Sequence, residues 1–207
     1  MIVVHHLNNS RSQRILWLLE ELGVPYEIKF YQRDATTNLA PPDLKEVHPL
    51  GKSPVIVDGV RTIAESGAIV DYLIRTYGKG KLAPPPGSPE HETYLEWLHY
   101  AEGSAMLPLM LLLYTMRLGD AAAPLKERID GEIDNNLEYI NQALSGRDYL
   151  LTQGFTGADV QLSFVGEVAR AFGRLGAFGN VEAWVDRLHE RPAFKAALEK
   201  GGAYNLA

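Results

Sequence analysis

The chain has 207 residues, of which 46% are hydrophobic and 22% are charged, and it contains no cysteine. This composition predicts one or two packed globular units and excludes a disulfide, a protein thiol nucleophile and a thiolate metal site. The formal charge of −6 is unevenly placed: residues 1–80 carry 9 positive and 9 negative side chains, whereas the rest carry 11 and 17. A neutral first part and an acidic second part argue against a nucleic-acid partner, because phosphate binding requires clustered Lys and Arg.

Neither end nor middle of the sequence predicts a membrane segment. The most apolar run, residues 106–116, is about half the length that a bilayer requires and contains Pro108. The first residues lack the basic start and the long apolar core of a signal peptide. We therefore expect no membrane partner and a cytoplasmic location.

The first 80 residues alternate between strand-like and helix-like patterns. The expected strands cover residues 1–6, 26–31, 54–57 and 61–64, and the expected helices cover residues 10–22, 41–47 and 66–77. The first two strands should be parallel because a full helix separates them, and the last two should form a hairpin around Asp58-Gly59. This order of elements is the thioredoxin-like α/β arrangement.

A segment rich in proline and glycine, residues 78–89, follows this unit and cannot continue a helix or a strand. All later periodicity is helical. The expected helices cover residues 90–118, with a bend at Pro108, and residues 125–144, 156–172, 181–190 and 192–200. We therefore divide the chain into a first domain of residues 1–79, a linker of residues 80–89 and an all-helical bundle domain of residues 90–207.

A serine-rich turn lies between the first expected strand and the first expected helix. Ser10 and Gln13 have the spacing of a capping box, which is a purely structural role. The same geometry directs backbone N–H groups and the positive end of the helix dipole at whatever lies there, so it also suits an anion. A hydroxyl that donates to a sulfur lowers the pKa of a thiol, and only the thiolate is a nucleophile. From the residues alone, both interpretations of Ser10 stay open.

The pairs Ser53-Pro54 and Glu65-Ser66, separated by a predicted hairpin and followed by a helix, resemble the glutathione-binding half of the glutathione S-transferase family. The resemblance implies a cis bond before Pro54, and a backbone at Ser53 that pairs with the cysteinyl part of glutathione. It also implies that Glu65 and Ser66 hold the γ-glutamyl group, and it makes Lys52 a candidate for the glycyl carboxylate. Family members usually have Val or Ile before the cis proline, but a main-chain role does not depend on the side chain.

The resemblance also gives candidates for the residue that activates the thiol. Ser10 lies four residues before Arg14, which is the relation found in the family's serine-type members. The chain looks most like a branch shared by fungi and bacteria, in which this residue is less uniform. Ser10 is therefore the first catalytic candidate, with Arg11 as a second thiolate stabiliser. The adjacent amide donors Asn8 and Asn9 are the alternatives, either of which would share the role or take it over.

Two motifs in the second part support the resemblance. Thr156 and Asp159 form a capping-box pattern at the place where the family's buried helix begins, and we assign it a folding role. An apolar stripe follows the linker, and it is either a buried helix seam or one wall of an electrophile pocket. The candidate pocket residues are Leu107, Met110, Leu111, Tyr114 and Arg117.

The resemblance implies a detoxifying glutathione transferase with glutathione as co-substrate and no metal. The thiolate of glutathione would attack a hydrophobic electrophile or reduce a peroxide. The resemblance also implies that the protein is a homodimer. The alternative is a non-catalytic glutathione- or ligand-binding protein or regulator, because a fold does not fix a function.

Overall fold

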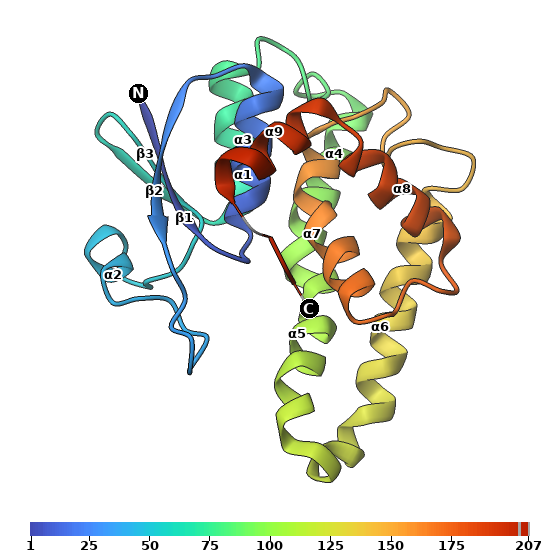
Figure 1. Ribbon diagram of the computed structural model, residues 1–207. Helices are drawn as coiled ribbons and strands as arrows, with labels where there is room; N and C mark the ends of the chain where they lie inside the picture. The colour runs from blue at the N-terminus through green and yellow to red at the C-terminus, as the bar shows by residue number, and fades with distance from the viewer. Residues whose placement is uncertain (203, 207) are drawn as a thin grey trace. The chain divides into compact units, whose positions relative to one another are not determined.

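The computed structural model describes residues 1–202 and 204–206 and shows the predicted fold class, a thioredoxin-like unit and an all-helical unit (Figure 1). One compact unit comprises Met1–Ala83 together with His189–Leu206, and the other comprises Pro84–Leu188. Residues 189–202 and 204–206 therefore belong with the first unit. This differs from our predicted helical domain of residues 90–207.

The first unit is built on a mixed four-stranded sheet with the order β2-β1-β3-β4. The strands are β1 (Ile2–Leu7), β2 (Tyr26–Tyr31), β3 (Val55–Asp58) and β4 (Arg61–Ala64). β1 and β2 are parallel, whereas β3 is antiparallel to both β1 and β4. The parallel orientation of β1 and β2 was predicted from the intervening helix, and the β3–β4 hairpin was predicted from the Asp-Gly turn, where Gly59 has a φ of 60°. The pairing of β1 with β3 was not predicted.

The helices of the first unit are α1 (Ser12–Leu22), α2 (Leu44–Val47), α3 (Ser66–Tyr77) and α9 (Pro192–Gly201). α1 begins two residues later than predicted, at Ser12, because the Ser10 hydroxyl accepts the N–H of Ser12 at 3.2 Å and keeps Ser10 outside the helix. α1 packs against both α3 and α9. Its first eight residues are all buried.

α9 docks on α1 through specific contacts. The ring of Phe194 meets that of Trp17 edge to face at 5.3 Å between centroids. Arg191 forms a two-pronged ion pair with Glu21 at 2.6 and 2.9 Å. A Cβ on Gly201 would lie 2.6 Å from Gln13 Oε1 and 2.8 Å from Leu16 Cδ1, so both of these buried side chains would have to shift to admit a larger residue. The amphipathic pattern of residues 192–200 predicts a helix but does not reveal its partner, which is why the sequence grouped this helix with the other helices of the second part.

The second unit is helical throughout its regular elements. They are α4 (Pro89–Tyr100), the π-helical turn η1 (Ala101–Ala105), α5 (Met106–Thr115), the 3₁₀ segment η2 (Met116–Ala122), α6 (Ala123–Ala143), α7 (Gly157–Ala171) and α8 (Gly179–His189). The predicted single helix over 90–118 is thus split at η1. Pro108 explains the position of η1: it lacks an N–H and its ring crowds the carbonyl four residues earlier, at Ser104, so the ladder shifts register there.

α7 forms the buried centre of this unit. Its residues from Gly157 to Ala169 are all buried, and the predicted capping box of Thr156 and Asp159 is present. The carboxylate of Asp159 accepts N–H groups from Leu150 at 3.0 Å, from Thr156 at 2.9 Å and from the indole of Trp184 at 3.0 Å. One buried carboxylate therefore joins the loop before α7, the start of α7 and the middle of α8.

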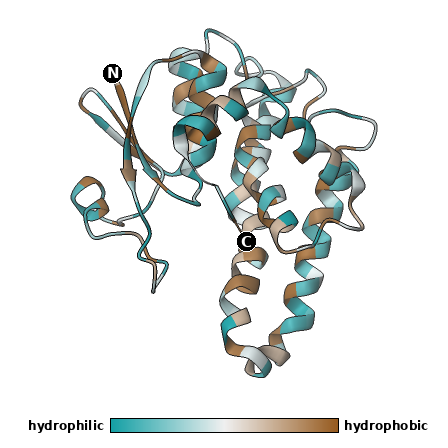
Figure 2. Cartoon of the chain, viewed as in Figure 1, coloured by the Kyte–Doolittle hydropathy of each residue, from teal (hydrophilic) through white to brown (hydrophobic). Residues whose placement is uncertain are grey.

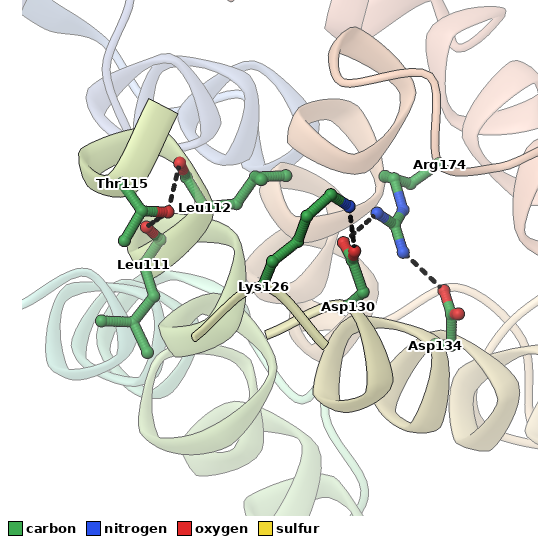
Figure 3. A network of polar contacts seen from close by, with 7 residues as sticks. All are labelled: Leu111, Leu112, Thr115, Lys126, Asp130, Asp134 and Arg174. Atoms are coloured by element: carbon green, nitrogen blue, oxygen red, sulfur yellow. Dashed lines mark hydrogen bonds and ion pairs between the residues drawn. The ribbon is translucent and has the colours of Figure 1, made fainter. Parts of the chain in front are cut away.

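The far ends of α5 and α6 are less buried. Figure 2 shows hydrophobic residues along α5. The exposed apolar side chains include Leu107 and Leu113 on α5 and Met116 and Leu118 on η2. Arg174, which follows α7, holds α6 through Asp130 at 2.6 Å and Asp134 at 2.8 Å (Figure 3).

The continuous helical stretch Pro89–Ala143 contains an 18-residue window with a mean hydropathy of 1.2, of which 22% is buried. By length and composition alone this stretch could span a membrane, whereas the sequence predicted no membrane segment. A single stretch of this kind is weak evidence for a membrane span, and the absence of a membrane partner stays a prediction.

Candidate functional site

Three strand ends meet at one edge of the sheet. β1 pairs His5 with Val55, and β3 pairs Val55 with Ala64. Continuing these antiparallel registers places Ser53 beside Leu7 and the Ser53-Pro54 pair beside the residues that follow β4. The Ser53-Pro54 bond is cis, as the resemblance implies. Residues that are far apart in the sequence are thus brought together at this edge.

The side chain of Ser53 completes the end of the ladder. Its hydroxyl accepts the N–H of Leu7 at 3.3 Å and donates to the carbonyl of His5 at 2.9 Å. A Val or Ile at this position could make neither bond, which gives the serine a structural reason. Among the described residues, the backbone N–H and carbonyl of Ser53 have no backbone hydrogen-bond partner. They are therefore available to an added extended peptide.

Glu65 and Ser66 lie at the start of α3. Glu65 has φ 67° and ψ 117°, a conformation that costs energy for a residue other than glycine and that is typical of functional sites. Glu65, rather than the predicted Ser66, is the N-cap, and its side chain makes no capping hydrogen bond. The exposed Glu65 carboxylate can bind a cation, while the first N–H groups of α3 can bind an anion. Lys52 is exposed, and its role stays a prediction.

The hydroxyl of Ser10 is directed into the protein. Ser10 is 5% exposed and donates to the carbonyl of Leu7 at 2.8 Å, while its oxygen lies 2.8 Å from the Ser12 hydroxyl. The Ser12 oxygen lies 2.8 Å from Nδ1 of His6, and Nε2 of His6 donates to the carbonyl of Gly201 at 3.1 Å. Because a carbonyl can only accept, Nδ1 is the acceptor of the Ser12 proton. Burial lowers the pKa of His6, which favours this neutral form.

Asn9 is arranged differently. Its backbone is left-handed with a φ of 50°, a conformation that asparagine tolerates better than most residues. Its side-chain oxygen accepts the N–H of Asn205 at 2.8 Å. Among the described residues, no hydrogen-bond partner is seen for its amide nitrogen, which carries two donors. Asn9 therefore offers N–H donors beside the end of β1, where Ser10 does not.

Arg33 is a site residue that sequence reasoning missed. Its guanidinium donates to the carbonyls of Asn8 at 3.1 Å and Asn9 at 3.3 Å, and its backbone N–H donates to the side chain of Asn8 at 2.8 Å. Burial and the nearby Arg11 lower the pKa of Arg33, so two guanidinium groups lie close to this turn. The parallel β1–β2 register brings the residue after β2 beside the turn after β1. Arg33 could have been predicted from the register of β1 and β2, but the sequence does not reveal that register.

The proposed electrophile residues lie on α5 and η2 in the helical unit. Leu107 is 57% exposed, Leu111 is 40% exposed and Tyr114 is 60% exposed. Met110 is half-buried and Arg117 is exposed. Leu107, Leu111 and Tyr114 are therefore not part of a buried helix seam. They form an apolar surface that is available to a ligand or a partner.

A thioredoxin-like unit with a cis proline at its sheet edge, joined to an all-helical unit, defines a narrow class of protein. The family model for the glutathione S-transferase N-terminal domain matches residues 1–75, and that for its C-terminal domain matches residues 104–192. The chain is 37% identical to glutathione S-transferase 3 of Schizosaccharomyces pombe, over 97% of the chain and 88% of that protein. It is 29% identical to glutathione S-transferase 1 of Saccharomyces cerevisiae, over 98% and 96%.

A crystal structure of a glutathione S-transferase from Actinobacillus pleuropneumoniae superposes with a TM-score of 0.89 at 32% identity, over 100% of this chain and 94% of that one. The chain therefore belongs to the glutathione S-transferase family. This confirms the resemblance inferred from Ser53-Pro54 and Glu65-Ser66, including its link to fungal and bacterial members.

Proposed function

We propose that this protein is a glutathione transferase that binds glutathione at the sheet edge and stabilises its thiolate with the Asn9 amide. The observation that carries the proposal is the meeting of three unlike binding groups at one edge. They are the unpaired backbone of Ser53, the N-terminus of α3 and the strained, exposed Glu65. Together they suit an extended peptide that carries both a carboxylate and an ammonium group.

Each part of glutathione has a matching group on the protein. The backbone of Ser53 pairs with the peptide as an added strand would. Ser66 and the N–H groups at the start of α3 donate to the γ-glutamyl carboxylate, and Glu65 accepts from its ammonium. Lys52 is the candidate for the glycyl carboxylate. Pro54 sets the direction of the backbone that follows Ser53.

Asn9 and the positive charge around it lower the pKa of the bound thiol. Glutathione, when bound, supplies a thiol with an ordinary pKa of about 8.5. Lowering this pKa by two units requires about 2.7 kcal/mol of preference for the thiolate. A donor at Asn9, the guanidinium of Arg11 and the N-terminus of α1 supply interactions of this size. The Ser10 hydroxyl shares its one proton between the Leu7 carbonyl and the Ser12 oxygen and acts by holding the turn, and its direct role in catalysis stays a prediction.

The exposed apolar stripe of α5 is the proposed wall for a hydrophobic electrophile. Leu107, Met110, Leu111 and Tyr114 supply apolar contact, and Arg117 supplies a positive charge. The overall reaction joins the sulfur to an electrophilic carbon while the leaving group departs with its electron pair, and the thiol proton passes to solvent. Reduction of a peroxide is a second activity of the same thiolate, and a symmetric homodimer is the proposed assembly.

Glu65→Ala is expected to weaken glutathione binding by about 10- to 100-fold, since a hydrogen bond to a charged group contributes about 1.5–3 kcal/mol. Isothermal titration calorimetry measures this change directly. Glu27→Ala is the matched control, because Glu27 is an exposed glutamate on β2 of the same unit. An unchanged dissociation constant for Glu65→Ala would remove Glu65 from the binding site.

One observation favours the non-catalytic alternative. The hydroxyl of Ser10, which serine-type members would use, is already satisfied inside the protein. A carrier would bind glutathione through the same sheet edge and leave the thiol protonated. Ultraviolet absorbance of the bound thiol near neutral pH separates the two functions, because only the transferase shows the thiolate band.

A further inference from the structure

The end of α9 and the segment that follows it are tied to β1 and to the turn that follows β1. The N–H of Asn205 donates to the side-chain oxygen of Asn9 at 2.8 Å. The carbonyl of Gly201 accepts from Nε2 of His6 at 3.1 Å. Two backbone groups from the end of the chain thus hold two side chains that lie almost 200 positions earlier. We propose that the described residues of this C-terminal segment, residues 201–202 and 204–205, form a positioning element that orients the Asn9 amide toward the thiolate.

The chemistry of a carboxamide makes its orientation decisive. One end of the Asn9 side chain is an acceptor and the other carries two donors, and the two ends have nearly the same shape. An N–H donor that bonds to the oxygen holds the oxygen on that side, so the NH₂ group faces the other side. Without the Asn205 N–H, the amide can turn over and present its oxygen to the sulfur, which repels a thiolate instead of stabilising it.

Other contacts near Asn9 cannot replace this bond. Arg33 donates to the backbone carbonyl of Asn9 at 3.3 Å, which fixes the turn but leaves the side chain free to rotate. The close packing of Gly201 against Gln13 and Leu16 holds the start of the segment in place. The segment therefore has an anchored base, at Gly201, and among its described residues Asn205 bonds to the Asn9 side chain.

Asn205→Pro tests the proposal in the full-length protein, because proline removes the N–H. We expect the fraction of bound glutathione present as thiolate at neutral pH to fall by about 3- to 10-fold, the factor that one neutral hydrogen bond is worth. Glutathione affinity should change much less, since Ser53, Glu65 and Ser66 are untouched. Asn205→Ala keeps the N–H, so in this variant the fraction of bound glutathione present as thiolate should equal that of the unchanged protein. Equal loss in both variants would overturn the proposal.

The proposal rests on the proposed function, and a double-mutant cycle with Asn9→Gly distinguishes the two. Glycine keeps the positive φ and removes the amide. If Asn9→Gly leaves the thiolate unchanged, the proposed role of Asn9 fails. If Asn9→Gly lowers the thiolate but Asn205→Pro does not, the positioning role alone fails. We expect Asn205→Pro to have no further effect in the Asn9→Gly background.

Hydrogen exchange gives a readout that needs neither glutathione nor activity. The Asn205 amide should be protected in the free protein and should lose that protection in Asn9→Gly. Thermal unfolding of each variant checks that the first unit stays folded. An Asn205 amide that exchanges at the same rate with and without the Asn9 side chain would overturn the proposal.

Discussion

Replacing Asn9 with aspartate is expected to lower turnover with glutathione by about 10- to 1,000-fold, the range for loss of one preorganised donor to a developing or full anion. Aspartate keeps the oxygen that accepts the Asn205 N–H and tolerates the left-handed backbone. It exchanges the two N–H donors for a negative oxygen. The pKa of the bound thiol should therefore rise, because the anion loses a hydrogen bond and gains a like charge.

The measurement is turnover with a chromogenic electrophile, together with ultraviolet titration of the bound thiol. Asn8→Asp is the matched control: Asn8 is the neighbouring amide, and its oxygen accepts the N–H of Arg33 at 2.8 Å. This variant adds the same charge one residue away and leaves the Asn9 amide intact. If the two variants lose activity equally, charge alone explains the effect and Asn9 is not the thiolate donor.

Ser10→Ala separates the two remaining interpretations of the turn. Its hydroxyl accepts the N–H of Ser12 at 3.2 Å and donates to Leu7 at 2.8 Å, so its loss should destabilise the protein by about 1 kcal/mol. If Ser10 is also the thiolate donor, the thiol pKa should rise in Ser10→Ala, by less than in Asn9→Asp because alanine adds no like charge. Stability must be measured beside turnover in this variant.

Asp159→Ala is expected to lower the free energy of unfolding by about 3–5 kcal/mol, because each buried N–H donor left without a partner costs about 1–3 kcal/mol. The side chain is completely buried and accepts N–H groups from Leu150, Thr156 and Trp184. Alanine would leave these donors buried without partners and would also remove the capping box of α7. Urea unfolding followed by tryptophan fluorescence or circular dichroism measures the change.

Asp186→Ala is the control for this variant. Asp186 pairs with Arg170 at 2.8 Å, but its side chain is 62% exposed, and exposed ion pairs contribute about 0–1 kcal/mol. Both aspartates bond across α7 and α8, so the comparison isolates the effect of burial. If the two variants unfold at the same urea concentration, the Asp159 network does not hold the helical unit together.

The local chemistry of the chain was enough to predict the elements of the first unit. The Asp58-Gly59 turn, the stop at Gly23 and the Glu-Ser pair before α3 are short-range patterns, and the bounds predicted for β2, β4 and α3 agree with the structure. The capping box at Thr156 was predicted for the same reason. Such patterns depend only on residues three or four positions apart.

Features that depend on long-range contacts were not predictable. The docking of α9 on α1, and hence the membership of residues 189–206 in the first unit, requires contacts across about 180 positions. The same holds for Arg33 at the Asn9 carbonyl and for the bond between Asn205 and Asn9. The split of the predicted 90–118 helix was missed by a few residues, because Pro108 disturbs the turn before it rather than its own position.

Titration of the purified protein with glutathione near neutral pH, followed by both heat and thiolate absorbance, tests the proposed function most directly. We expect saturable binding together with a thiolate band, because the sheet edge binds the peptide and Asn9 stabilises its anion. Binding without the band would contradict the catalytic role and support a carrier. No binding would show that the edge formed by Ser53, Glu65 and Ser66 is not a glutathione site.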